Sequence, residues 1–219
     1  MEMKAAIFDM DGTLVDSMFL WDVLWEALGE RYLGDKSFKP TDADSKTMRT
    51  LILKDAMELV HSRYQIGESG EVLLQIANEL IQDFYATQVK LKPGVRDFLE
   101  YCKGKGIKMC VASATALELV SVAMNHCGIS DCFLKIFSCA ELGKGKEEPD
   151  IFLHAAAFLG EDIRETWVFE DSLTAIETAT KIGMPTVGIY DRFNYGHDRM
   201  RAIATEYIAP GETLMKIVR

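Results

Sequence analysis

The sequence predicts a doubly wound α/β fold, in which helices cover a Rossmann-like parallel sheet and an all-helical domain is inserted after the first strand. Short apolar runs without alternation are typical of parallel strands that are buried on both faces. Segments with apolar residues at helical spacing separate these runs, as crossover connections require. The stretch from residue 17 to residue 90 carries helical stripes and no good strand, which indicates a separate helical domain.

The core strands are expected in chain order at residues 4–8, 106–112, 134–138, 166–169 and 186–190, with a short last strand near Tyr207 and Ile208. Helical stripes lie between them, and Gly128 and Gly183 follow two of these stripes, where glycine commonly ends a helix. The apolar members of the stripes are Val95, Phe98, Leu99 and Cys102, then Leu119, Val120, Ala123, Met124 and Cys127, then Ala175, Ile176, Ala179 and Ile182. We therefore expect residues 1–16 and 91–219 to form one core.

The inserted domain is expected to span residues 17–90. A polar break from Asp35 to Asp44, which contains Pro40, follows its first helical stripe. The stripes are Leu20, Leu24, Ala27 and Leu28 with Trp21 and Trp25 beside them, then Leu51, Met57 and Val60, and then Val72, Ile76, Leu80 and Phe84.

The chain is acidic. Lys and Arg number 24 and Asp and Glu number 34, which gives a net charge of −10. Such a surface repels nucleic acid and anionic membranes, so we expect neither as a partner. No apolar run is long enough to span a membrane and no signal peptide precedes the first strand, so the cytoplasm is the expected location. A monomer is the default expectation for the oligomeric state. The five cysteines are odd in number and lack C-x-x-C spacing, which favours reduced, mostly buried thiols and no zinc site.

Two carboxylates follow the first strand. Asp9 ends this strand and Asp11 comes two positions later, so in extended geometry both side chains point to the same side. Gly12 then permits a sharp turn. Without a basic residue nearby in the sequence, such a pair favours a hard divalent cation. A solvated turn is the alternative, because Asp and Gly are common in turns.

Further polar residues follow the later strands. Ser113 and Ala114 offer a hydroxyl and free amides at a helix start, which suits an anion, although Ser is also a common helix cap. Lys146 follows the third strand, and Glu170 and Asp171 form a second acidic pair after the fourth. Because ligands of open α/β sheets bind beyond the carboxyl ends of the strands, we expect these side chains to converge on one site.

These segments resemble the motifs of one superfamily. They are Asp-Met-Asp-Gly-Thr-Leu-Val-Asp-Ser at residues 9–17, Ser113, Lys146 with Pro-Asp-Ile-Phe at residues 149–152, and Phe-Glu-Asp-Ser at residues 169–172. In their order and spacing the chain resembles the haloacid dehalogenase-like hydrolases, in the branch of β-phosphoglucomutase and the phosphoglycolate-type phosphatases. The resemblance covers residues 4–16 and 91–209, and the insert matches the family's cap domain in position and kind only.

The resemblance implies a role for each residue. Asp9 is expected to be the nucleophile that forms an aspartyl-phosphate, and Asp11 the general acid and then the general base. The implied cofactor is Mg²⁺, held by Asp9, the Asp11 backbone carbonyl and Asp171, with Glu170 helping directly or through water. The phosphoryl oxygens are expected to be held by Ser113, Ala114 and Lys146.

Departures from the mutase pattern favour hydrolysis. Thr13 stands where the β-phosphoglucomutase type commonly has Val, Trp21 where it has His, and Ala116 where it has Lys. The resemblance therefore implies a Mg²⁺-dependent phosphatase that acts on a small phosphorylated metabolite such as a sugar phosphate, with a phosphosugar mutase as the alternative. Glu147 replaces a proline that commonly follows the family lysine, so Lys144 is a weak competitor for the same role, but the spacing to Pro149 favours Lys146.

The insert and the rival functions give weaker signals. Trp21 and Arg49 are candidates for substrate contact. Packing in the core of the insert would explain Trp21 equally well, and a solvated helix face would explain Arg49.

A dehalogenase needs neither Asp11 nor a metal. A phosphonatase needs a cap lysine in an apolar setting, which the insert does not offer clearly. A regulatory or binding protein on the same fold is the second alternative, because a fold does not imply an activity. His197 is interpreted as a surface loop residue.

Overall fold

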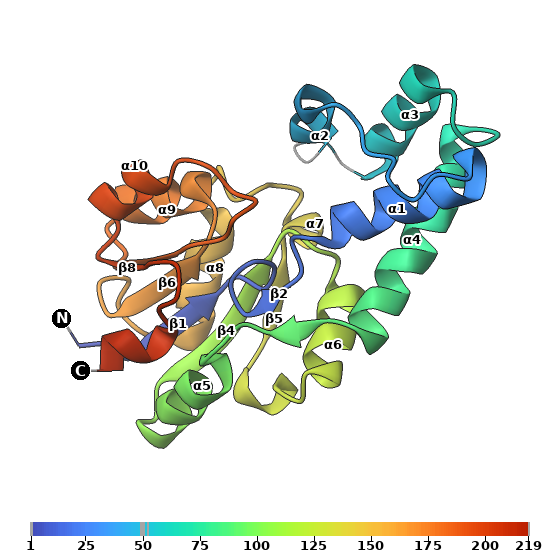
Figure 1. Cartoon of the computed structure of the whole chain (residues 1–219). Helices are drawn as coiled ribbons and strands as arrows, with labels where there is room; N and C mark the ends of the chain where they lie inside the picture. The colour runs from blue at the N-terminus through green and yellow to red at the C-terminus, as the bar shows by residue number, and fades with distance from the viewer. Residues whose placement is uncertain (1, 49–50, 52, 219) are drawn as a thin grey trace. The chain divides into compact units, whose positions relative to one another are not determined.

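The chain folds as two compact units in the computed structural model, which describes residues 2–48, 51 and 53–218, except for the side chain at 46. One unit comprises Met1–Met18 and Val89–Arg219, and the other Phe19–Gln88. Figure 1 shows the helices and strands of both units. None of the helices in the described part of the chain is both long and apolar enough to cross a membrane.

The first unit is built on a parallel sheet with the order β5-β4-β1-β6-β7-β8. Its strands are β1 (Ala5–Phe8), β4 (Lys108–Ser113), β5 (Ile136–Ser138), β6 (Thr166–Glu170), β7 (Thr186–Ile189) and β8 (Glu206–Ile208). In register, Ile7 of the central strand β1 lies between Cys110 and Val168. The predicted doubly wound α/β fold is therefore confirmed, and the strand order reverses beside β1, where ligands of such sheets bind.

Side chains that alternate along the strands build a core on each face of the sheet. On one face Ala5 and Ile7 pack with buried residues of α8 (Asp150–Leu159) and α9 (Leu173–Lys181). On the other face the fully buried Phe8 stacks on Phe169, with ring centroids 4.4 Å apart, and meets Phe98 of α5 (Val95–Gly104) edge-on. Each fully buried Phe contributes about 1.5–3 kcal/mol, and these contacts hold the strand just before Asp9.

Several short elements complete this unit. They are α6 (Leu117–His126), η1 (Ser130–Cys132), α7 (Cys139–Leu142), α10 (His197–Ile203) and η2 (Leu214–Val218). Helical spacing in the sequence does not predict α7, α8 or α10. Helix α8 is apolar around most of its circumference, so it lacks a polar stripe, and α7 and α10 are too short for a periodic pattern. His197 is half-buried at the start of α10 and is not a loop residue, which corrects the prediction.

Two short strands lie where the chain leaves this unit and returns to it. β2 (Val15–Asp16) pairs antiparallel with β3 (Lys90–Leu91), with Val15 opposite Leu91. The backbone N–H of Lys92 then donates to Leu14 O at 2.9 Å. The return segment is thereby fixed to the residues that follow Asp9, which brings Lys92 close to the first acidic motif.

The second unit is helical, with α1 (Leu20–Leu33), α2 (Asp42–Met48), α3 (Leu53–Tyr64) and α4 (Gly70–Thr87). Buried Leu24, Trp25 and Leu28 of α1 belong to its core. Ser69 caps the start of α4, because its side chain accepts a hydrogen bond from Val72 N at 3.2 Å. Two predictions need correction, because α2 begins inside the predicted polar break and Leu51 is exposed before α3 begins.

The cysteines of the chain are all free thiols. Four of them are buried, and Cys132 is half-buried. Burial raises the pKa of the Cys102 and Cys110 thiols to about 12, so both stay protonated at neutral pH. These cysteines behave as small core residues, as their sequence setting predicts.

Candidate active site

The first acidic motif forms a tight turn at the end of β1. Asp9 N donates to Phe169 O at 2.9 Å, which keeps Asp9 in line with the sheet. The carbonyl of Met10 then accepts hydrogen bonds from the N–H groups of Leu14 and Val15. Gly12 adopts a φ of +76°, and a Cβ at this position would collide with the Asp171 carboxylate. Only glycine allows the turn to approach the second acidic motif this closely.

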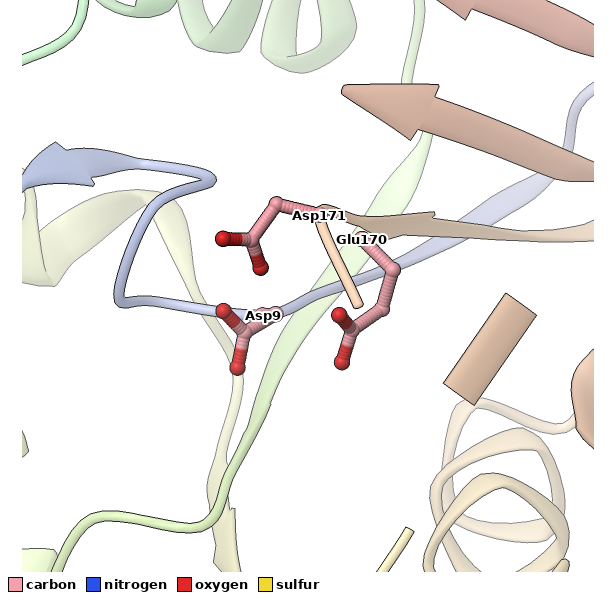
Figure 2. Close-up of side chains that lie close together, drawn as sticks. All are labelled: Asp9, Glu170 and Asp171. Carbon is pink, nitrogen blue, oxygen red and sulfur yellow. The ribbon is translucent and has the colours of Figure 1, made fainter. Parts of the chain in front are cut away.

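The two acidic motifs meet at the carboxyl ends of β1 and β6. One side-chain oxygen from each of Asp9, Glu170 and Asp171 lies within 4.8 Å of the other two, and all three residues are buried (Figure 2). Glu170 ends β6 and Asp171 follows it, so these two side chains leave the chain in different directions and meet Asp9 from two sides. The arrangement gathers hard oxygen donors in one buried place, which is the donor type that Mg²⁺ prefers.

Lys146 supplies a positive charge to this cluster. Its ammonium group donates hydrogen bonds to the carboxylates of Asp9 and Glu170, the latter at 2.5 Å. The Lys146 side chain is 11% exposed, whereas Lys144 is half exposed and forms an ion pair with Asp150 at 2.8 Å. The structure therefore brings Lys146 to the cluster and leaves Lys144 at the surface.

The cluster gathers three acidic side chains around one lysine. Burial raises the pKa of the Asp9 carboxyl to about 8, with Lys146 opposing this shift and the Glu170 and Asp11 charges adding to it. Burial and then the charges of Asp9 and Glu170 also raise the pKa of Asp171 well above its ordinary value. Burial works against the charge of Lys146, but the two carboxylates outweigh it and raise the pKa of this lysine. A divalent cation among these carboxylates would relieve their repulsion.

Asp11 lies apart from the three-carboxylate cluster and is held by hydroxyl groups. Ser17 Oγ donates to one of its carboxylate oxygens at 2.5 Å, and Thr115 Oγ1 donates to the other at 2.7 Å. Ser113 is buried at the end of β4, and its hydroxyl accepts a hydrogen bond from Thr115 N at 3.0 Å. Neither Ser17 nor Thr115 is a predicted site residue. Ser17 ends the first acidic motif and Thr115 lies two residues after Ser113. A hydroxyl residue close to the end of a strand was therefore the sequence feature that could have identified them.

A third element reaches the cluster from the end of β7. Asn194 donates its side-chain amide to Asp171, and the ammonium of Lys92 contacts Asp191 at 2.9 Å. Lys92 also donates to the backbone carbonyl of Gly12. The sequence gives no signal for these contacts, because Lys92 is distant in the chain and an Asn in a loop is ordinary.

The remaining predicted site residues are Ala114, Trp21 and Arg49. Ala114 is exposed directly after β4. Trp21 is half-buried, packs against the core of the helical unit, and lies 5.4 Å from Trp25 between ring centroids. Arg49 lies outside the described residues.

The fold and the site together define a Rossmann-like α/β core with an acidic, lysine-containing centre at the carboxyl ends of its strands. The family model for haloacid dehalogenase-like hydrolases matches residues 3–183, and the chain belongs to this family.

Individual relatives align with nearly the whole chain. A phosphorylated carbohydrates phosphatase from Thermotoga maritima is 26% identical, over 97% of each chain. A β-phosphoglucomutase from Bacillus subtilis is 28% identical, over 85% of this chain and 83% of its own. The crystal structure of a presumed β-phosphoglucomutase from Thermotoga maritima superposes with a TM-score of 0.83 at 25% identity, over 99% of each chain.

Proposed function

We propose that the chain is a Mg²⁺-dependent phosphatase that hydrolyses a small phosphorylated carbohydrate with Asp9 as the nucleophile. The observation that carries this proposal is the contact of the Lys146 ammonium with both Asp9 and Glu170, within a buried cluster that Asp171 completes. A cation and several carboxylates at one strand edge suit phosphoryl transfer, which depends mainly on positioning and charge stabilisation.

The residues of the cluster fit a Mg²⁺ ion. The donor set is all oxygen, one oxygen from each of the three acidic residues lies within 4.8 Å of the other two, and Lys146 pairs with two of these residues. Asp9, Asp171 and the backbone carbonyl of Asp11 would hold the ion, with Glu170 as a direct or water-mediated partner. When bound, Mg²⁺ screens the repulsion between an anionic nucleophile and an anionic phosphate.

The side chains have distinct roles in this mechanism. A carboxylate oxygen of Asp9 attacks phosphorus, and the bond from phosphorus to the leaving oxygen breaks while Asp11 gives that oxygen a proton. A water then attacks the aspartyl-phosphate, passes its proton to Asp11 and releases phosphate and the Asp9 carboxylate. The hydroxyls of Ser17 and Thr115 orient Asp11 through both of its oxygens.

The phosphoryl group needs positive partners and hydrogen-bond donors, because this chain has a net charge of −10. We assign this task to Lys146, the Ser113 hydroxyl and the backbone at Ala114. Lys146 would release part of its contact with Asp9 and Glu170 to the phosphoryl oxygens as the charge on phosphorus develops.

Hydrolysis is favoured over isomerisation by three residues and by one relative. Thr13, Trp21 and Ala116 depart from the β-phosphoglucomutase pattern. The Thermotoga maritima relative is named for phosphorylated carbohydrates, which is the substrate class that we propose here. The relative from Bacillus subtilis keeps a phosphosugar mutase as the second candidate. We further propose that the helical unit is the cap that selects the substrate.

The test is a screen of phosphorylated sugars and other phosphorylated metabolites, including β-glucose 1-phosphate, scored for both phosphate release and isomerised product. We expect phosphate release that requires Mg²⁺ and stops on addition of EDTA. Isomerised sugar phosphate without phosphate release would establish the mutase instead. Undiminished turnover in EDTA would contradict the proposed metal-dependent mechanism.

A further inference from the structure

Asp171 differs from its two acidic neighbours in the partner that holds it. Lys146 contacts Asp9 and Glu170, but the hydrogen bond to the Asp171 carboxylate comes from a neutral group. The side-chain amide of Asn194 donates to Asp171 Oδ2 at 2.5 Å and to the Asp171 backbone carbonyl at 3.1 Å. Asp171 is 4% exposed, so this amide fixes a carboxylate that has little contact with water.

The loop that carries Asn194 is itself firmly held. Asp191 Oδ1 accepts a hydrogen bond from Phe193 N at 3.0 Å, and the Asp191 backbone carbonyl accepts one from Asn194 N at 3.1 Å. At the far end of the loop, Gly196 has a φ of +76° and lies so close to Leu173 of α9 that a Cβ would collide with the leucine side chain. These contacts fix the position of Asn194 beside the start of α9.

A buried ion pair joins this loop to the turn after β1. Lys92 contacts Asp191 Oδ2 at 2.9 Å, and the two side chains are 16% and 4% exposed. The same ammonium donates to the backbone carbonyls of Tyr190, at 3.2 Å, and Gly12. One lysine therefore connects the end of β7 with the turn that carries Asp11. The contacts run from Gly12 through Lys92, Asp191 and Asn194 to Asp171.

We propose that Asn194 is a positioning residue for the metal-binding carboxylate Asp171, and that the Lys92–Asp191 ion pair holds Asn194 in place. This inference rests on the proposed function, because it assumes that the cluster holds Mg²⁺. The partner groups of a metal ligand fix its orientation, and their loss typically lowers metal affinity or activity 10- to 100-fold. Here the partner is an amide, which orients Asp171 without neutralising the charge that the cation needs.

Two substitutions test the two properties of the Asn194 side chain, its hydrogen-bond donor and its lack of charge. Asn194→Ala removes the donor, and we expect the Mg²⁺ dissociation constant, measured by isothermal titration calorimetry on the metal-free chain, to rise about 10-fold or more. Asn194→Lys restores a donor but adds a positive charge, and we expect Mg²⁺ binding to weaken at least as much. Mn²⁺ binding followed by electron paramagnetic resonance gives a second readout that is independent of turnover. Asn125→Ala, at an exposed position of α6, is the matched control and should bind Mg²⁺ like the wild type.

The outcomes distinguish this inference from the proposed function. Circular dichroism and the unfolding temperature in EDTA establish that each variant is folded, and Asn194→Leu, which also lacks a side-chain donor, replaces Asn194→Ala if the latter does not fold. Wild-type affinity in Asn194→Ala, or in Asn194→Lys, overturns the inference and leaves the proposed function standing. A wild-type protein that binds neither Mg²⁺ nor Mn²⁺ overturns both. Metal binding without phosphate release by the wild type contradicts the proposed function, while the affinity of the variants still decides the role of Asn194.

Discussion

Lys146 donates a hydrogen bond to the carboxylate of Asp9, a residue 137 positions away in the sequence. The same ammonium reaches Glu170, so one buried cation links the ends of β1 and β6. Lys144, only two residues earlier, contacts Asp150 at the surface. This difference between two neighbouring lysines is the basis of the first prediction.

Lys146→Met is expected to lower the rate of phosphate release by about 10²- to 10³-fold, because the transition state loses a positive partner in a buried site. The metal-free protein should also lose about 3 kcal/mol of unfolding free energy, since two buried carboxylates are left without their cation. Lys144→Met is the matched control and should leave both quantities close to the wild-type values, because its ion pair is exposed. Steady-state kinetics and urea unfolding measure the two effects. Equal activity losses in the two variants would contradict the assignment of Lys146.

Asp9→Asn is expected to abolish phosphate release, by about three orders of magnitude or more, because the amide is a far weaker nucleophile than the carboxylate. The fold should be kept. Burial already disfavours a charge at this position, so the variant should unfold in EDTA at a temperature no lower than that of the wild type. The checks are single-turnover kinetics and differential scanning calorimetry. Retained turnover in this variant would remove Asp9 from the mechanism.

Replacement of residues 19–88 by the corresponding segment of the Thermotoga maritima phosphatase is expected to change which phosphorylated sugar reacts fastest. The reason is that the three clustered carboxylates, Asp9, Glu170 and Asp171, all belong to the first unit, which leaves the helical unit free to select the substrate. The ranking of kcat/KM over a substrate panel measures the effect, with Mg²⁺ affinity as the control that should stay constant. An unchanged ranking would show that the core, rather than the helical unit, selects the substrate.

Asp44 gives the helical unit a pH-dependent contribution to stability. The hydrogen bond from the Tyr64 hydroxyl, at 2.6 Å, holds the pKa of the Asp44 carboxyl below its ordinary value, and Arg63 acts in the same direction. A lowered folded-state pKa means that the stabilisation is complete above the unfolded-state pKa of about 3.9 and is lost as the pH falls through the folded-state value.

Asp44→Asn should therefore unfold at a lower temperature than the wild type at pH 7, and the difference should shrink below about pH 4. Asp42→Asn, at an exposed position in the first turn of the same helix, is the control and should show a much smaller change. Thermal unfolding followed by circular dichroism between pH 3 and pH 7 measures both variants. A difference that persists unchanged at pH 3 would show that the carboxylate charge is not its source.

Regular local patterns allowed most of the core to be predicted. Strand β1 and the middle of β6 are continuous apolar runs, and α5 has a clear apolar stripe, so each pattern matches one type of element. Helix α8 is apolar on most sides, so its sequence shows no apolar stripe at helical spacing. Strands β2 and β3 have two residues each, which is too short for an alternating pattern. Their existence depends on burial against the sheet and on pairing between segments that are far apart in the chain.

The sequence by itself determined the parallel α/β core, the helical insert and the acidic motifs at the ends of β1 and β6, because strand type and strand ends are local properties of the chain. The spacing to Pro149 already favoured Lys146 over Lys144, and the tertiary structure showed the contacts of each lysine. Only the tertiary structure brought Asn194, Lys92 and Asp191 to the motifs. These residues are ordinary in their local sequence. Their positions follow from the order of the strands in the sheet and from the direction in which each loop leaves its strand, and neither can be read from a local pattern.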